Sequence, residues 1–511
     1  MNWLARSVAP PRILRLLSNS KGDYRIGFVP AALVVVLVAS INFLGDLGKP
    51  AAPIWDESYY LTAAARYEDR IAQFASHPPL GLALIAAGDA LLHPNRHLDT
   101  RRMGWDKKIA GDKIPHGYSF AGVRFASGVF SVLGALAFFA LMYVFTGSPA
   151  AALAFSNLYL FENAFIVHFR AAQLDGFQIA FVLATLLCFA VSARRGARSS
   201  PGVELLLGMG CGLAIMVKAN AVVLGLLGVM LVGRRIALAW QREQHGRVLL
   251  RGARDGAVMV AGCCAAMAAV LTFHVVFNRV PPIAASPAGE KDLSFMSHSY
   301  LAYLQRKRPL SPRVLAAAGW DYIEFMADDF EGITRTDPNG SRPIEWPLHR
   351  GTINYRWDSN GDKTAYVQLT GNLFGWMLAL AALIGSAAWL TIARVRRWPS
   401  AHPERRALMG MLLLQYLAFM AVHIYIGEQR VMYLYHYFIG LVLTFCLVPL
   451  LAAEAAERWP ALKARQGQLL GAMVVMLWAC FIFYSPLTFH RYLTHGQCEW
   501  RNVLQHVVNC Q

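Results

Sequence analysis

The residues best suited to chemistry are two adjacent carboxylates, Asp56 and Glu57, which follow the first long apolar run of the chain. A carboxylate at the centre of a membrane-spanning helix costs about 2.5–3.5 kcal/mol on insertion scales, so acidic residues near membranes occupy aqueous cavities or functional sites. Further along, His77 precedes Pro78 and Pro79, and each proline fixes its own φ and disfavours helix in the residue before it. Acidic pair and turn indicate one structured loop, in which an aspartate could accept a proton from an attacking hydroxyl.

The composition is that of a membrane protein. Of 511 residues, 56% are hydrophobic and only 15% are charged, which soluble globular proteins rarely show. The formal net charge of +17 would suit nucleic acid, but the basic residues fall in clusters between apolar runs and form no RNA-binding signature. By the positive-inside rule, we expect these clusters in the cytoplasm. They lie at residues 12–25, 194–198, 234–254, 394–406 and 458–465.

Apolar runs long enough to cross a bilayer recur along the whole chain. A spanning helix needs about 20 residues, and about 11 such runs are present, of which the fifth and sixth are short. They cover residues 26–44, 120–145, 150–167, 171–193, 203–217, 219–232, 257–277, 372–393, 408–426, 432–452 and 469–483. The first run is long and no convincing cleavage site follows it, so we interpret it as an uncleaved helix rather than a signal peptide.

This topology predicts one all-α polytopic membrane domain over residues 1–511. With the N-terminus in the cytoplasm, every basic cluster is cytoplasmic. The external face then carries a first loop over residues 45–119 with the acidic pair, a second loop over residues 278–371 and a tail over residues 487–511. In the tail, a disulfide between Cys498 and Cys510 is left open, and the other cysteines suit buried thiols in or beside helices.

Basic side chains gather at the expected outer ends of the helices. For any one of them, a lysine such as Lys218 above all, snorkelling to the interface is the ordinary explanation. Several beside a carboxylate pair favour a phosphate site, because guanidinium groups bind phosphate oxygens bidentately and ammonium adds a point charge. The residues concerned are Arg124, Arg170, Lys218, Arg430 and His436, with Asp175 close to Arg170.

A carboxylate beside a phosphate site predicts transfer of a group from a phosphorylated lipid to a hydroxyl or amine. The cations would stabilise charge developing on the leaving phosphate, and the carboxylate would take the proton of the acceptor. The chain has no glycine-rich nucleotide loop, which fits a donor carried by a lipid on the external face.

Several segments also match a known family in their order along the chain. They are the Asp56-Glu57 pair followed by HPPLG, GVRFASGVFSVLG around Arg124, FENAFIVHFRAAQLD ending at Asp175, GCGLAIMVKANAVVLGL around Lys218, and later SRPIEWPLHRGTINYRW, GNLFGW, RVMYLYHYFIGL and YSPLT. In these segments the chain resembles the protein O-mannosyltransferases, enzymes of the GT-C superfamily that use dolichyl- or polyprenyl-phosphate-mannose. It departs from the family pattern at Leu82, where lysine is usual, at Leu373, where proline is usual, and at Val275.

The resemblance implies roles for three residues. Asp56 would be the catalytic base, Glu57 would orient the acceptor, and Arg124 would bind the donor phosphate. The reaction would be a direct displacement at the anomeric carbon with inversion. For Asp56 and Glu57, the alternative is that they cap the helix that follows.

Other candidates have both structural and functional explanations. His77 would either hold the loop shape or line the substrate site, and Arg430 and His436 are candidates for donor contact. We expect Asp175 to pair with Arg170 rather than to line the site. Trp346 would shape the second loop or stack on sugar or acceptor.

The resemblance further implies a bacterial cytoplasmic (inner) membrane enzyme with its active site on the external, periplasmic side, because the second loop is too short for the MIR domain of eukaryotic members. Its partners would be a polyprenyl-phosphate-linked sugar donor, a protein or peptide acceptor and the bilayer, without nucleic acid. The sequence shows no metal-ligand set; a divalent cation and a dimer are left open. The alternatives are a GT-C transferase for another sugar onto lipid A or a glycolipid, or a non-enzymatic polyprenyl-phosphate transporter, which would place charges near the bilayer midplane.

Overall fold

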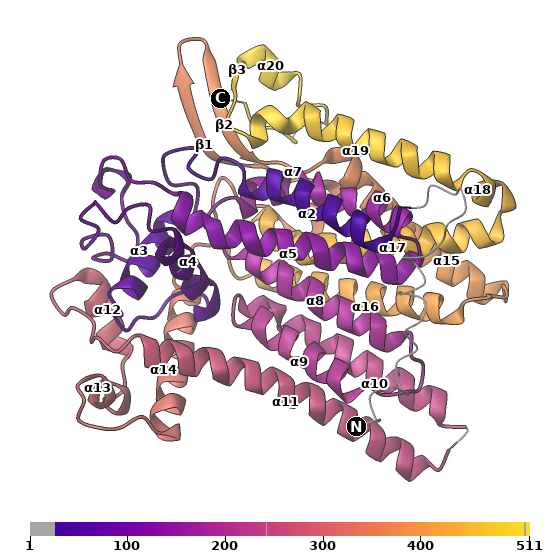
Figure 1. The fold of residues 1–511 in the computed structure, drawn as a ribbon, viewed down its shortest axis with the longest axis horizontal. Helices are drawn as coiled ribbons and strands as arrows, with labels where there is room; N and C mark the ends of the chain where they lie inside the picture. The colour runs from indigo at the N-terminus through magenta and orange to yellow at the C-terminus, as the bar shows by residue number, and fades with distance from the viewer. Residues whose placement is uncertain (1–25, 242, 505–506, 511) are drawn as a thin grey trace.

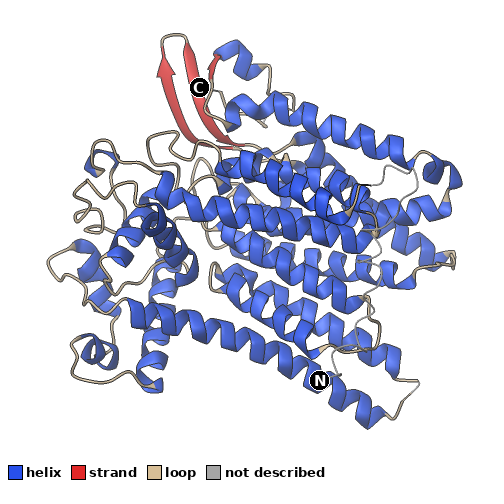
Figure 2. Cartoon of the chain, viewed as in Figure 1, coloured by secondary structure: helices blue, strands red, loops and turns tan. Residues whose placement is uncertain are grey.

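The computed structural model describes residues 26–241, 243–504 and 507–510, so the basic cluster expected at residues 12–25 lies outside it. The described chain is a bundle of roughly parallel long helices with smaller elements gathered at one end (Figure 1). Helices dominate the described residues, in which strands occur only in a small sheet at the same end (Figure 2).

The predicted spans are present as helices. Within the described residues, eight helices are long and apolar enough to cross a membrane, and a bent pair makes a ninth. The eight are α5 (Ala121–Thr146), α8 (Asp175–Ala193), η2 with α10 (Ala219–Leu224 and Gly225–Ala239), α11 (His245–Phe277), α15 (Leu373–Val395), α16 (Pro403–Gly427), η4 with α17 (Leu434–Tyr437 and Phe438–Arg458) and α19 (Gln466–Thr488). Two expected runs form the shorter apolar helices α2 (Phe28–Leu44) and α9 (Pro201–Ile215). The chain is therefore a multi-pass membrane protein.

The third expected span is bent rather than straight. Helices α6 (Pro149–Leu160) and α7 (Asn163–Phe169) meet at 62°. Glu162 stands at the bend, where its carboxylate accepts the N–H of Ala164 and, at 2.9 Å, the N–H of Asn372. These contacts satisfy groups that a break in a helix would otherwise leave unpaired.

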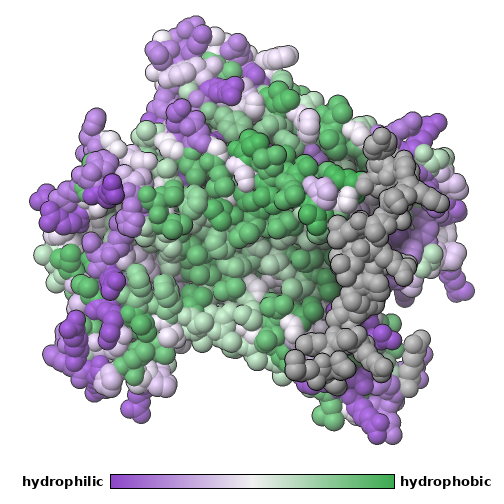
Figure 3. All heavy atoms as spheres, in the orientation of Figure 1, coloured by the Kyte–Doolittle hydropathy of each residue, from purple (hydrophilic) through white to green (hydrophobic). Residues whose placement is uncertain are grey.

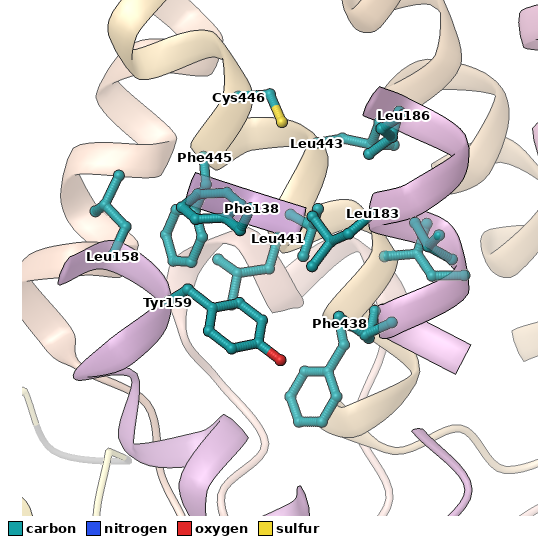
Figure 4. Packing of buried hydrophobic residues seen from close by; sticks show 14 of the residues in the cluster. Phe138, Leu158, Tyr159, Leu183, Leu186, Phe438, Leu441, Leu443, Phe445 and Cys446 are labelled. Carbon is teal, nitrogen blue, oxygen red and sulfur yellow. The ribbon is translucent and has the colours of Figure 1, made fainter. Parts of the chain in front are cut away.

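Close packing of α5, α8 and α17 forms the centre of the bundle. Phe138, Tyr159, Phe438 and Phe445 interlock there with leucines of α8 and α17 (Figure 4). Outward-facing side chains such as Leu37 of α2 and Ile482 of α19 are exposed. The apolar surface forms a broad band between polar ends (Figure 3), as expected for a surface in contact with lipid.

Two polar regions meet at the end of the bundle opposite the short helix α18 (Pro460–Ala464) (Figure 1). The first contains α3 (Glu57–Glu68), α4 (Pro79–Leu92) and η1 (Gly111–Lys113); the second contains α12 (Pro287–Phe295), α13 (His298–Leu304), α14 (Pro312–Glu331) and η3 (Pro343–Leu348). A buried carboxylate, Asp292 of α12, joins them by pairing with Arg66 and Lys107 and by accepting the N–H of Phe74 at 3.0 Å.

The small sheet is an addition to the predicted all-α fold. Strands β1 (Ile353–Asn360) and β2 (Lys363–Leu369) form an antiparallel hairpin, and β3 (Tyr492–Thr494) of the tail pairs with β2, giving the order β1-β2-β3. The tail continues into α20 (His495–Glu499), and Cys498 forms a disulfide with Cys510. The sheet thus ties the tail to the second polar region.

Candidate active site

Asp56 stands at the start of α3 with its side chain free of helix capping. It occupies the N-cap position but makes no side-chain capping hydrogen bond, and the helix begins at Glu57. The residue before it, Trp55, has a φ of 50°, a left-handed conformation that is unusual for a bulky residue. The capping alternative is therefore not realised for Asp56, whose carboxylate instead accepts a hydrogen bond from Tyr435.

The surroundings of Asp56 suit a general base. Burial raises the pKa of this carboxyl to about 6; Lys218 and Lys108 act against the rise and the charge of Asp175 adds to it. A carboxylate with a pKa near the operating pH is ionised at neutrality and still basic enough to take a proton in a transition state.

Glu57, the next residue, is enclosed in a closed ion pair with Arg124 of α5. Both side chains are 0% exposed, with Arg124 Nε 2.7 Å from Glu57 Oε1 and Nη2 2.8 Å from Oε2. The other guanidinium N–H groups donate to the carbonyl oxygens of Leu47, Pro50 and Ala52. All five donors of Arg124 are thus used within the protein, and none is left for a donor phosphate.

Glu57 is equally occupied. Its carboxylate also accepts the backbone N–H of Ile54 and of Ala172, each at 2.7 Å. The pair therefore fastens the segment before α3 to α5 and to the turn before α8. In this arrangement Glu57 and Arg124 bind to each other and to the backbone, and they hold the segment that carries Asp56.

Lys218 and Asp175 form a second charged pair, and both charges act on Asp56. Lys218 Nζ is 2.7 Å from Asp175 Oδ2, and the ammonium lies 5.1 Å from the centre of the Tyr435 ring. Our expectation that Asp175 pairs with Arg170 is wrong. Asp175 begins α8, so its carboxylate faces the end of α9, where Lys218 lies, and not the preceding turn.

A hydrogen-bond chain continues from Asp175 to the sheet. His168 Nε2 is 2.7 Å from Asp175 Oδ2, and His168 Nδ1 is 2.6 Å from the hydroxyl of Tyr355 on β1. His168 also stacks on Tyr435, with ring centres 5.0 Å apart. These hydrogen bonds connect the Asp175–Lys218 pair with strand β1. Trp55 lies beside this strand, since its ring stacks on Tyr355 with centres 5.2 Å apart.

His77, Arg430 and His436 complete the group. Burial, assisted by the positive charges of Lys218 and Arg430, lowers the pKa of His77 to about 3, so this side chain is neutral. Burial also lowers the pKa of Arg430, whose guanidinium lies 5.0 Å from the Phe330 ring. His436 lies in η4, just before α17; its Nδ1 accepts the backbone N–H of Tyr433 at 3.1 Å, and its ring lies 4.5 Å from the Tyr435 ring.

Two predicted site residues lie outside this group. Arg170 donates to the carbonyl of Gly45 at 2.5 Å, at the end of α2, and lies over the Phe489 ring. Trp346 is fully buried; it donates to the hydroxyl of Ser341 and stacks on His436. Stacking of Trp346 on a sugar is therefore excluded in this conformation.

Comparisons with known proteins identify the family of the chain. The family model of the dolichyl-phosphate-mannose-protein mannosyltransferases matches residues 33–272, and that of the C-terminal four-transmembrane region of protein O-mannosyltransferases matches residues 320–507. The chain belongs to the protein O-mannosyltransferase family of glycosyltransferases. This confirms the resemblance drawn from its motifs.

Single curated proteins and solved structures match this chain at low sequence identity. Protein O-mannosyl-transferase 2 of Danio rerio is 29% identical over 177 residues, which is 34% of this chain and 22% of the zebrafish protein. The structure of the S. cerevisiae Pmt1-Pmt2 complex bound to the sugar donor matches with a TM-score of 0.75 at 13% identity, covering 97% of this chain and 94% of the other. The oligosaccharyltransferase of Archaeoglobus fulgidus matches with a TM-score of 0.46 at 8% identity, covering 93% and 58%. The yeast match confirms the predicted GT-C-type fold.

Within this family fold, sequence analysis missed His168, Tyr355, Tyr435 and Lys108. His168 lies in an apolar helix, where a lone histidine is usually part of the core, and Tyr355 lies in a strand that was not predicted. Tyr435 adjoins His436 in RVMYLYHYFIGL and was the one that the sequence could have revealed. In the described part of the chain, no three His, Cys, Asp or Glu side chains are grouped as metal ligands.

Proposed function

We propose that this protein transfers mannose from a polyprenyl-phosphate-linked donor to Ser or Thr hydroxyls of proteins. The observation that carries the proposal is Asp56, a carboxylate that caps no helix, has a pKa raised to about 6 by burial and faces the cations of Lys218 and Arg430. Membership of the family supports mannose as the sugar and protein as the acceptor.

In the proposed reaction, Asp56 takes the proton of the acceptor hydroxyl while its oxygen attacks the anomeric carbon. The bond between that carbon and the phosphate oxygen breaks, and the polyprenyl phosphate leaves with the bonding electrons. Because attack and departure occur on opposite faces, the configuration at the anomeric carbon inverts. Lys218 and Arg430, with His436 beside them, stabilise the negative charge on the phosphate.

Roles for the remaining residues follow from their contacts. Asp175 holds Lys218 at 2.7 Å and is itself held by His168, so we assign both to positioning the ammonium. Glu57 and Arg124 hold the start of α3 and thereby the direction of Asp56. His77, neutral and partly exposed, lines the site.

We further propose that the reaction takes place at the external face of a bacterial cytoplasmic membrane, with the N-terminus in the cytoplasm. Two observations support this orientation. The proposed site adjoins both long polar regions at one end of the bundle, while the connections between α8 and α9, α10 and α11, and α15 and α16, which carry basic clusters, lie at the other end (Figure 1). Basic clusters of this kind favour the cytoplasmic side.

The test is transfer of radiolabelled mannose from polyprenyl-phosphate-mannose to Ser/Thr peptides by the purified protein and by Asp56→Asn. We expect the wild type to label peptide, and the variant to be at least 10²-fold slower at equal expression and thermal stability. The anomeric configuration of the product, measured by NMR, tests inversion. Near-normal transfer by a folded Asp56→Asn protein would overturn the role of Asp56. Labelling of glycolipid instead of peptide would overturn the acceptor class.

A further inference from the structure

A cavity of about 660 Å³ opens beside the proposed base, between the first polar region and the sheet. Its volume falls within the range of ligand pockets, about 300–1,000 Å³. Side chains from five separate segments line it, among them Trp55, Lys108, Asn339, Tyr355, Trp357 and Asn509. Trp55 and Ser58, which flank Asp56 and Glu57 in the sequence, both line the cavity.

One wall of the cavity is strand β1, which is an edge strand of the described sheet. Strand β2 covers one side of β1, and the other side has no strand partner in the described chain. An edge strand presents a row of unpaired N–H and C=O groups, to which an extended peptide can add as another strand. The pairing of β1 with β2 is also irregular between Asn354 and Arg356, and Tyr355 between them lines the cavity.

Trp55 forms the boundary between the cavity and Asp56. Its indole stacks on Tyr355 at 5.2 Å and meets the ring of Tyr433 edge-on at 5.5 Å. The φ of 50° at Trp55 directs this side chain to one side of the chain while Asp56, the next residue, faces Lys218. Backbone strain of this kind persists only where surrounding contacts hold it, and it concentrates at functional sites.

The lining matches a polypeptide better than a lipid. The cavity is formed by loops and a strand, and its side chains include the amides of Asn339 and Asn509, which can donate to and accept from a peptide backbone. The exposed Trp357 offers an aromatic surface for alternate side chains of a strand. Lys108 is exposed, lies over the Tyr59 ring, and forms no ion pair among the described residues.

We propose that this cavity binds the acceptor polypeptide as an extended strand along the free edge of β1, with an acidic side chain of the acceptor at Lys108. This rests on the proposed function and adds to it the conformation and the charge preference of the acceptor. The accepting Ser or Thr passes Trp55 to reach Asp56, and the neighbouring residues of the acceptor pack against Tyr355 and Trp357.

The test measures KM for peptide and, separately, the slow hydrolysis of the donor without peptide. The peptides carry one Ser or Thr with Asp or Lys two residues before or after it, and a further set has single backbone amides N-methylated along its length. We expect Asp peptides to have a KM about two- to fivefold lower than Lys peptides, the size of an exposed ion pair. We expect N-methylation to raise KM at alternate residues only, because alternate amides of a strand face the same edge.

Variants assign these effects to the cavity. Lys108→Glu should reverse the preference between Asp and Lys peptides, and Trp357→Ala should raise KM about tenfold for all peptides. Donor hydrolysis should stay unchanged in Trp357→Ala. For Lys108→Glu the readout is the ratio of KM between Asp and Lys peptides, because the charge of Lys108 also acts on Asp56. Matched controls are Lys307→Glu and Trp500→Ala, which change an exposed lysine and an exposed tryptophan outside the cavity and should leave KM unchanged.

Failure of this proposal is distinguishable from failure of the proposed function. If peptides are mannosylated but KM is the same in Lys108→Glu, Trp357→Ala and wild type, the acceptor binds elsewhere and the cavity proposal is wrong. Equal effects of N-methylation at every position would exclude strand addition. If donor is hydrolysed but no peptide is mannosylated, it is the protein acceptor, and hence the proposed function, that fails.

Discussion

Replacing Arg124 should destabilise the fold and slow the reaction without weakening donor binding. Arg124→Ala removes the cation that pairs with the Glu57 carboxylate, which is 0% exposed. It also removes the hydrogen bonds to the carbonyl oxygens of Leu47, Pro50 and Ala52. Removing one partner of a buried ion pair costs about 3–5 kcal/mol. We expect a loss of this size in the free energy of unfolding, and a lower kcat per folded molecule because the start of α3 moves.

The assay combines thermal unfolding in detergent with transfer kinetics, normalised to the folded fraction. Arg235→Ala is the matched control, since it removes an equally buried arginine whose partners, Glu204 and Asp255, lie at the other end of the bundle. It should cost similar stability and leave kcat per folded molecule unchanged. If Arg124 bound the donor phosphate, Arg124→Ala would instead keep wild-type thermal stability and raise the donor KM; that result would refute the structural assignment.

A double-variant cycle sharpens the same prediction. Glu57→Ala alone leaves the guanidinium buried without its carboxylate, whereas the double variant leaves neither charge. The loss in the double variant should therefore fall short of the sum of the single losses by about 0.5–3 kcal/mol, as for residues in contact. Losses that simply add would show that the two side chains do not interact.

Three further predictions follow from the site and the tail. Because burial raises the pKa of Asp56 to about 6 and only the ionised form accepts a proton, kcat/KM should rise with pH through that value and level off above about pH 7; a flat profile from pH 5 to 8 would contradict the assignment. Lys218→Met should raise the donor KM about tenfold or more, the effect of losing a hydrogen bond to a charged group; an unchanged donor KM would mean that the ammonium does not meet the phosphate. Cys498→Ser, Cys510→Ser and the double variant should each lose about 2–4 kcal/mol of stability with transfer per folded molecule kept, and unequal losses among the three would speak against the disulfide.

The spans were predictable because length and hydropathy alone identify them. A run of about 20 apolar residues has few other stable states in a bilayer. The bend at Glu162 was not predictable, since the N–H of Asn372 that meets its carboxylate is 210 residues away in sequence. The sheet was not predicted for a similar reason: β1 and β2 lie within a polar region, and the third strand comes from the tail, far away in sequence.

In the site, sequence identified the residue types better than their partners. Asp175 and Arg170 are neighbours in sequence, yet Asp175 pairs with Lys218, 43 residues further on, and Arg170 binds the end of α2. Which of several cations faces a given carboxylate depends on how α7, α8 and α9 pack, and no local pattern encodes that choice. The contact of His168 with Asp175 could not be predicted for the same reason, because it depends on how the helices pack.

The adjacency of Asp56 and Glu57 acquires a physical explanation from the structure. Asp56 is the N-cap residue and Glu57 the first residue of α3, and adjacent residues at a helix start do not face each other. Glu57 faces Arg124 and is enclosed on all sides, while Asp56 faces Lys218 and Tyr435. The pair is therefore not a dyad that shares a proton. Glu57 fixes the start of α3. Because the start of the helix is held in this way, the Asp56 carboxylate can remain partly buried and directed at the cations without capping the helix.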